Sequence, residues 1–145
     1  MAEEMVLEAR NRAGNYFREG YNCAESIFLT FREMVAPEVE RDLVRMATGF
    51  GGGLGHAGCI CGALTASTMV IGLLCGRTDN RQDRHRAYEL ARGFHERFEE
   101  TFGVTCCRSL NPHPFDTPEH LRHCLKITGN TARLLMEYLQ EKRLV

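Results

Sequence analysis

The chain has 145 residues and a mass of 16.4 kDa, which is the size of a single domain. Its hydrophobic content of 43% and net charge of −1 exclude a disordered chain, and the balance of 18 basic and 19 acidic side chains excludes a general affinity for nucleic acid. The amino-terminal segment is acidic and polar and lacks the features of a signal peptide, so we expect a cytoplasmic protein. Seven cysteines are many for this length, and reduced, cysteine-rich chains often bind metal or carry out redox chemistry.

The first part of the chain has the pattern of two helices. Residues 3–18 contain mostly good helix formers, and Gly20 is placed to end that helix. Asn22 is a candidate N-cap for the next helix, because Glu25 stands at the capping-box position. Apolar residues at helical spacing follow, and Pro37 ends the pattern.

The middle of the chain contains a long stretch without charge. A third helix is predicted over residues 38–48, with its inward side chains Val39, Leu43 and Met46 or Ala47. From Met46 to Gly76 there is no charged residue, but the apolar part, Cys59 to Cys75, has only 17 residues and sits at the short limit for a membrane span. We therefore expect residues 49–58 to form a flexible connection and residues 61–74 a buried helix, with no membrane insertion.

The last third of the chain predicts two more helices. The first covers residues 80–102 and ends at Gly103, and residues 111–118 hold three prolines and form a loop. Asp116 or Thr117 caps the last helix, whose expected packing residues are Leu121, Cys124 or Leu125, Thr128, Leu135, Tyr138 and Leu139. No alternating strand pattern occurs. The sequence therefore predicts an all-α fold, a compact bundle of about five or six helices, with residues 1–145 forming a single domain.

Two motifs outside the cysteines have weaker interpretations. Residues 53–58 match the G-x-G-x-x-G pattern of dinucleotide-binding proteins, but a helix rather than a strand precedes them, so nucleotide binding is not supported. The glycines instead let the backbone approach a buried centre or a neighbouring helix closely. His120 and Cys124 are spaced to hold a metal on one helix face, yet histidines so close to a helix start are usually exposed, and we expect this for His120.

The cysteines differ in local context. Cys23, Cys61 and Cys124 lie at or near predicted helix starts, where backbone N–H groups stabilise thiolate. Cys75 lies at a helix end, where thiolate is disfavoured, and is assigned to packing. The chain has no C-x-x-C motif, so neither a thioredoxin-type site nor covalent c-type haem is supported.

Several short segments with cysteines resemble one family of proteins. These segments are Tyr21-Asn22-Cys23-Ala24-Glu25-Ser26, Gly49-Phe50-Gly51-Gly52-Gly53, Cys61-Gly62-Ala63-Leu64-Thr65, Cys107-Arg108 and Cys124. Together they resemble the C_GCAxxG_C_C family of redox-active proteins over nearly the whole chain. The resemblance places the four characteristic cysteines at Cys23, Cys61, Cys107 and Cys124 and leaves Cys59, Cys75 and Cys106 outside the pattern. It departs at Ala66, where the family has glycine.

The family is similar to the cluster-carrying part of split-Soret cytochromes. This similarity implies that Cys23, Cys61, Cys107 and Cys124 ligate an iron–sulfur cluster or another metal, for electron transfer or sensing. Two alternatives remain open: thiol–disulfide oxidoreductase chemistry with the same cysteines, and a structural zinc site in an interaction module.

The glycine-rich stretch and the uncharged helix suit a close contact between two copies, so we expect a homodimer. The sequence has no signature of a substrate pocket and assigns neither an enzymatic activity nor an electron-transfer partner.

Overall fold

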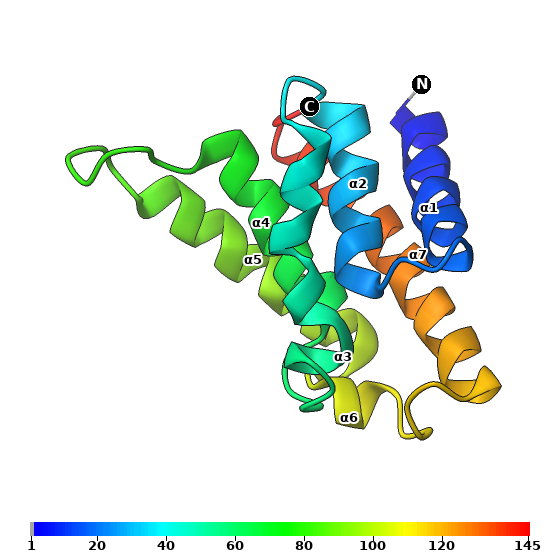
Figure 1. Ribbon diagram of the computed structural model, residues 1–145. Coiled ribbons are helices and arrows are strands. Elements are labelled where there is room, and N and C mark those ends of the chain that lie inside the picture. Colours follow the sequence, from blue (N-terminus) through cyan, green and yellow to red (C-terminus); the bar gives the residue numbers. More distant parts are fainter. Residues whose placement is uncertain (1) are drawn as a thin grey trace.

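The computed structural model describes residues 2–145, which form seven α-helices, two 3₁₀ helices and no strand (Figure 1). The α-helices are α1 (Ala2–Arg18), α2 (Cys23–Val35), α3 (Gly51–Leu54), α4 (Gly62–Cys75), α5 (His85–Phe102), α6 (Cys107–Leu110) and α7 (Pro118–Glu141). The 3₁₀ helices are η1 (Arg41–Met46) and η2 (Thr48–Phe50). The predicted all-α single domain is confirmed, and the described residues form slightly more helices than the five or six expected.

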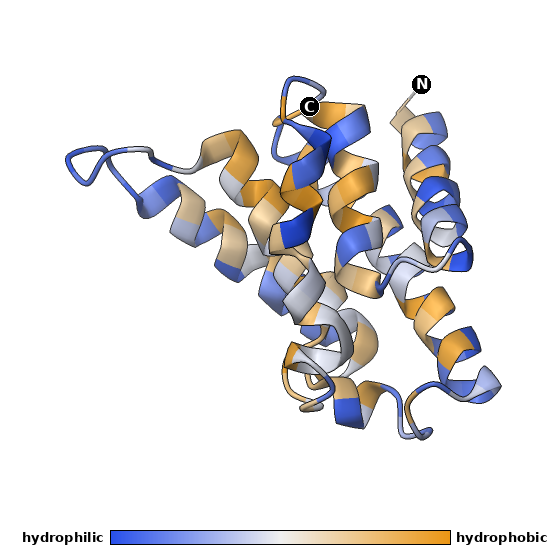
Figure 2. Ribbon diagram, in the orientation of Figure 1, coloured by the Kyte–Doolittle hydropathy of each residue, from blue (hydrophilic) through white to orange (hydrophobic). Residues whose placement is uncertain are grey.

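The bundle is built around the long helix α7. Helix α1 packs along α7, α2 packs against both α1 and α4, and α4 pairs with α5. Helices α4 and α5 form an antiparallel hairpin whose far end projects from the rest of the molecule (Figure 1). The 14-residue helix α4 is hydrophobic along its length, whereas the outer surface of α5 is largely hydrophilic (Figure 2). No helix within residues 2–145 has both the length and the apolar content needed to cross a membrane.

The predicted capping box at the start of α2 is present and extends into a wider network. The Asn22 side chain accepts a hydrogen bond from the Glu25 backbone N–H at 2.8 Å, and the Glu25 carboxylate accepts one from the Asn22 N–H at 2.9 Å. The Asn22 amide also donates to the Thr48 carbonyl, and the Thr48 hydroxyl donates to Glu25. The cap therefore ties η2 to the start of α2, where the first of the family cysteines lies.

The helix predicted over residues 38–48 is wrong in type and in orientation. The segment forms the 3₁₀ helix η1, whose threefold repeat changes which side chains face the core. Leu43 and Met46 are 38% and 63% exposed, whereas Ala47 is fully buried and Val39 packs against the core. Of the three expected inward positions, Leu43 is therefore wrong, and Ala47 rather than Met46 is the buried one of the two alternatives at the third.

The later part of the chain also differs from the prediction in three places. Helix α5 begins at His85 instead of residue 80, because polar side chains hold residues 78–82 in a turn: the Thr78 and Asp79 backbone N–H groups donate to Gln82. Cys107 begins the short helix α6, which the sequence did not predict. Leu121, predicted to pack, is 47% exposed.

We expect the capping network to contribute measurably to stability. Asn22→Ala should lower the free energy of unfolding by about 1–2 kcal/mol, because it leaves the Glu25 backbone N–H of α2 without its partner. Asn130→Ala is the matched control: Asn130 is exposed within α7, and this change should move stability by less than about 0.5 kcal/mol. Urea unfolding followed by circular dichroism measures both, and equal effects would contradict the assignment of the cap.

Candidate functional site

Four thiols gather at the end of the bundle where several helices begin. Cys23 is the first residue of α2, Cys61 caps α4, Cys107 is the first residue of α6, and Cys124 lies in the second turn of α7. The first three are buried and Cys124 is half-buried. The four thiols interact electrostatically, because negative charge on Cys23 raises the pKa of the other three.

Backbone pairing brings the starts of α4 and α6 together. Ile60 and Cys106 form an isolated antiparallel bridge, in which the Cys61 N–H donates to the Thr105 carbonyl at 2.8 Å and the Cys107 N–H donates to the Cys59 carbonyl. This bridge fixes Cys61 and Cys107 relative to each other, although 46 positions separate them in the sequence. The spacing of the cysteines along the chain does not predict this bridge.

The glycine-rich segment 51–58 is a folded turn that packs against the thiols. Gly53 has a φ of +66°, and a Cβ there would lie 2.8 Å from the Cβ of Cys107 and 2.6 Å from the Cys59 nitrogen. A Cβ at Gly62, the first residue of α4, would lie 2.7 Å from the Cys23 sulfur. These glycines allow the close backbone approach that the sequence predicts, and the approach is to cysteine side chains. The expectation of a flexible connection is wrong, since residues 51–54 form α3 and the Cys59 N–H bonds to the Gly53 carbonyl.

Cys23 is the thiol most easily ionised. A hydrogen bond with the Cys124 thiol lowers the pKa of Cys23, burial opposes this, and the backbone N–H groups of Gly52 and Ala24 add to the lowering. The sulfur therefore lies among donors that favour its negative form. Such donors serve a thiolate equally well as a nucleophile and as a metal ligand.

The other three thiols are held in their neutral form. Burial and the charge of Cys23 raise the pKa of Cys61 to about 12, although the N–H groups of Ala63 and Leu64 oppose the rise. Burial also raises the pKa of Cys107, and the hydrogen bond to Cys23 together with burial raises that of Cys124. In the absence of a bound cation, the four sulfurs together therefore favour a single negative charge. Further charges would repel one another, because these thiols are poorly exposed to water.

The three cysteines outside the family pattern have other surroundings. Cys59 and Cys106 are exposed, and Cys75 lies at the end of α4, where its thiol donates to the Ile71 carbonyl. Ala66, which replaces the family glycine, is fully buried, so the core of the bundle accommodates its methyl group. Within residues 2–145, no three His, Cys, Asp or Glu side chains are grouped closely enough to hold a single metal ion.

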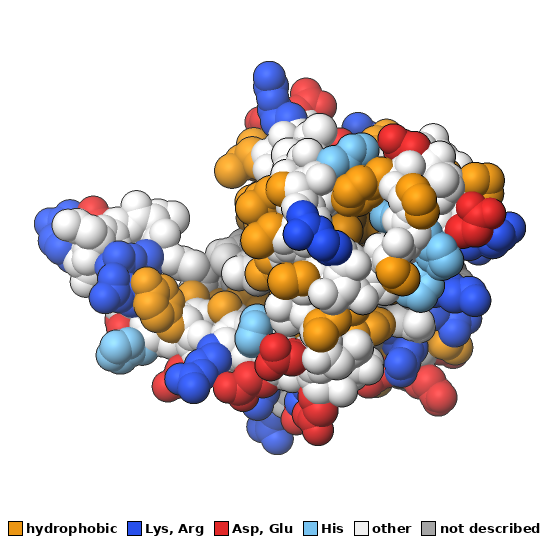
Figure 3. Space-filling view, turned by 90° about the horizontal axis from the view of Figure 1, so that it is seen from below, with side chains coloured by type: hydrophobic (Ala, Val, Ile, Leu, Met, Phe, Trp, Pro, Cys, Tyr) orange, Lys and Arg blue, Asp and Glu red, His pale blue; other side chains and the backbone are white. Residues whose placement is uncertain are grey.

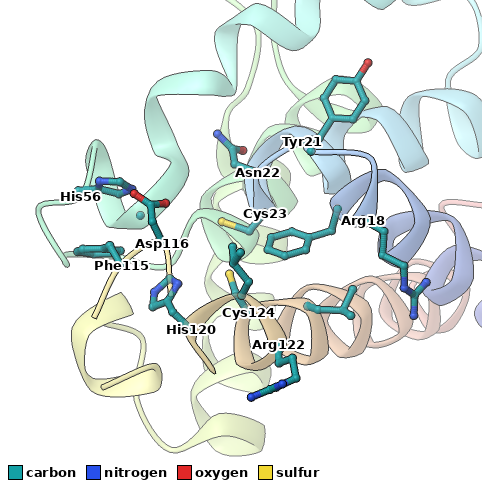
Figure 4. Close-up of a pocket in the computed structure, with 15 residues that line it drawn as sticks. Arg18, Tyr21, Asn22, Cys23, His56, Phe115, Asp116, His120, Arg122 and Cys124 are labelled. Carbon is teal, nitrogen blue, oxygen red and sulfur yellow. The ribbon is translucent and has the colours of Figure 1, made fainter. Parts of the chain in front are cut away.

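A cavity of about 460 Å³ opens beside Cys23 and Cys124 (Figure 4). One of its lining residues, His120, is more buried than the sequence predicts. His120 was expected to be exposed but is only 6% exposed, because Phe115 from the preceding loop packs beside its ring at a centroid distance of 4.9 Å. Neither ring nitrogen has a hydrogen-bond partner, and burial lowers the pKa of His120. Its spacing of four residues from Cys124 was the available signal, since both side chains line the cavity.

Seen from this end, the surface carries histidine and hydrophobic side chains side by side (Figure 3). Four of the six histidines lie near one another here: His113 and His123 are in edge contact, His56 stacks on Phe115, and His120 interacts electrostatically with the other three. The thiols therefore lie beneath a surface that is rich in imidazole groups.

Comparisons with known proteins agree with the pattern of cysteines. Residues 21–138 match a family described as "Putative redox-active protein (C_GCAxxG_C_C)". A protein of Archaeoglobus fulgidus, described as "Uncharacterized protein", is 28% identical over 149 aligned residues, which cover 97% of this chain and 99% of the relative. No solved structure matches the chain significantly.

The close approach of Gly62 to the Cys23 sulfur leads to a test of the site's packing. Gly62→Ala should destabilise the protein by about 1–3 kcal/mol, because the added methyl group overlaps the sulfur and must displace it. Gly72→Ala on the same helix is the matched control: a Cβ there meets nothing, so the change should stabilise by about 0.5–1 kcal/mol. Thermal unfolding of both variants distinguishes the two sites, and stabilisation by Gly62→Ala would show that the thiol is not packed against α4.

Proposed function

The chain belongs to the C_GCAxxG_C_C family of redox-active proteins, and we propose that its four shared cysteines hold an iron–sulfur cluster that transfers or senses electrons. The proposal rests on one observation. Cys23, Cys61, Cys107 and Cys124 come from four different helices and interact with one another at one end of the bundle. Four thiolates are the usual ligand number of such clusters.

Within residues 2–145 these side chains form no site for a single metal ion, but their surroundings have features that suit a cluster of several iron atoms, whose ligand sulfurs lie further apart than those of one ion. Backbone N–H groups at the starts of α2 and α4 point at Cys23 and Cys61, and hydrogen bonds to sulfur are among the features that tune cluster potentials. Gly53 and Gly62 let the backbone lie directly against the side chains of Cys107 and Cys23, where any side chain would clash. A bound cluster supplies reversible one-electron chemistry, and its positive iron offsets the repulsion that keeps three of the four thiols neutral without it.

A second candidate function is thiol–disulfide exchange, which the contact between Cys23 and Cys124 favours. A hydrogen bond between the two side chains favours the thiolate of one of them, and the other thiol lies close enough to act as the resolving cysteine. In this reaction the Cys23 thiolate attacks an external disulfide and releases one thiol. Cys124 then displaces the second thiol, so that the two cysteines lose two electrons and two protons overall.

Purification without oxygen decides between the candidates. Cluster-containing protein should be brown, with iron and sulfide in near equal amounts and absorption that bleaches on reduction. Cys61→Ser and Cys124→Ser should each abolish the colour, because a serine oxygen replaces a thiolate poorly. Cys75→Ser is the matched control and should stay brown, since Cys75 lies apart from the four thiols at the far end of α4.

Two other outcomes would contradict cluster ligation. Colourless protein with stoichiometric zinc would support a structural metal site in an interaction module. Colourless, metal-free protein that forms a Cys23–Cys124 disulfide on mild oxidation, located by mass spectrometry of its peptides, would support thiol–disulfide exchange.

We also propose that the chain forms a homodimer through the projecting α4–α5 hairpin. Helix α4 has no charged residue, and apolar side chains remain exposed on the hairpin, where Leu73 is 38% and Tyr88 61% exposed. Light scattering should give twice the chain mass of 16.4 kDa, and Leu73→Arg should reduce it to the monomer. Leu43→Arg is the matched control, because Leu43 is equally exposed but lies on η1. A monomeric wild-type chain would overturn this assembly.

A further inference from the structure

The cavity beside the thiols has the size and walls of a site for a small organic molecule. Its volume of about 460 Å³ lies within the usual range of ligand pockets, about 300–1,000 Å³. Aromatic and aliphatic side chains form much of its wall: Phe17, Phe115, Leu121 and Leu125. Its lining comes from α1 and the following loop on one side, and from α7 and the loops around Gly52 and Phe115 on the other (Figure 4).

His120 marks the buried end of this cavity. His120 is only 6% exposed, yet its Nδ1 and Nε2 atoms have no hydrogen-bond partner. Buried polar groups are almost always paired, because leaving one unpaired costs stability. A neutral imidazole presents one donor and one acceptor, so a polar group of a bound molecule would satisfy one of the two nitrogens.

The cationic groups of the cavity lie apart from His120. Arg18 lies at the opposite side in the close-up, and Arg122 lines the outer part from α7 (Figure 4). Asp116 is the one carboxylate among the lining residues, and it is close enough to His120 to affect its pKa. The Arg18 guanidinium is exposed and donates to Asn15 Oδ1 at 3.1 Å, and its remaining N–H donors are those with which an anion at this end of the cavity would pair.

We propose that this cavity binds a small, flat aromatic carboxylate, with a polar group of its ring system against His120 and its carboxylate toward Arg18. The apolar walls suit the ring system, the unpaired imidazole suits its polar group, and the guanidinium suits the carboxylate. Because Cys23 and Cys124 belong to the same wall, the bound ring lies against the sulfurs. The ligand acts as a redox partner only if the proposed function holds, whereas its binding does not depend on a cluster.

Naphthalene derivatives provide matched probes for this site. We expect 6-hydroxy-2-naphthoate to bind saturably to the full chain in isothermal titration calorimetry. Loss of the hydroxyl group, in 2-naphthoate, should weaken binding about tenfold, the effect of one hydrogen bond to a buried partner. Replacement of the carboxylate by a neutral alcohol, in 6-hydroxy-2-naphthalenemethanol, should weaken it by a similar factor.

Two variants connect each part of the probe to one residue. In His120→Phe, which keeps an aromatic ring but removes both nitrogens, the hydroxyl group should make no difference to affinity. In Arg18→Gln, the carboxylate should make little difference. The controls are His85→Phe and Arg45→Gln, because both residues are exposed and lie outside the cavity, so these variants should retain the wild-type preferences.

The test distinguishes this inference from the proposed redox function. The Cys61→Ser variant should lose the colour of a cluster but keep its affinity for 6-hydroxy-2-naphthoate, since Cys61 does not line the cavity. His120→Phe should also unfold at the same or a higher temperature, because it removes two unpaired polar atoms. Absence of saturable binding, or an equal effect of the hydroxyl group in the wild type and in His120→Phe, would overturn the proposal.

Discussion

The contact of several helix starts around the Cys23 sulfur is the constraint on which the rest of this end of the molecule depends. The sulfur accepts a hydrogen bond from Cys124 of α7, lies near the N–H groups of Gly52 and Ala24, and touches the first residue of α4. A side chain at Gly62 would break this arrangement directly. Gly62 is therefore required by the packing of the Cys23 sulfur, whereas Gly53 and Gly58 of the G-x-G-x-x-G match lie against the Cys59 backbone and the Arg108 side chain, so that match reflects local packing.

The thiol end and the rest of the bundle are built differently. Long helices form the contact of α1 with α7 and the core between α2 and α4, and the core cluster that contains Phe28, Phe31 and Leu135 extends to Cys23 and Cys61. The thiol end, in contrast, is built from short helices, left-handed glycines and one isolated bridge. If one of the sulfurs moved, a backbone of this kind would have few other ways to pack around it. A rigid scaffold thus holds a local site whose geometry is sensitive to single methyl groups.

Local signals in the sequence predicted several helix boundaries. The capping box of Asn22 and Glu25 and the stop at Gly103 depend on residues within a few positions of one another, and the structure has both. Features that depend on distant contacts were missed. The register of η1 is set by packing against α2, and the pairing of Cys61 with Cys107 requires a bridge between segments far apart in the chain. His120 is buried because a loop places Phe115 over it, which helix periodicity cannot reveal.

The central claim is that the four family cysteines form one metal-binding redox centre, and the location of iron tests it most directly. Crystals grown without oxygen should give one strong anomalous-scattering peak at the iron absorption edge, within bonding distance of the sulfurs of Cys23, Cys61, Cys107 and Cys124. A map without an iron peak, with the Cys23 and Cys124 sulfurs joined in a disulfide, would contradict it. Iron bound at the histidine-rich surface while the four thiols remain free would contradict it equally.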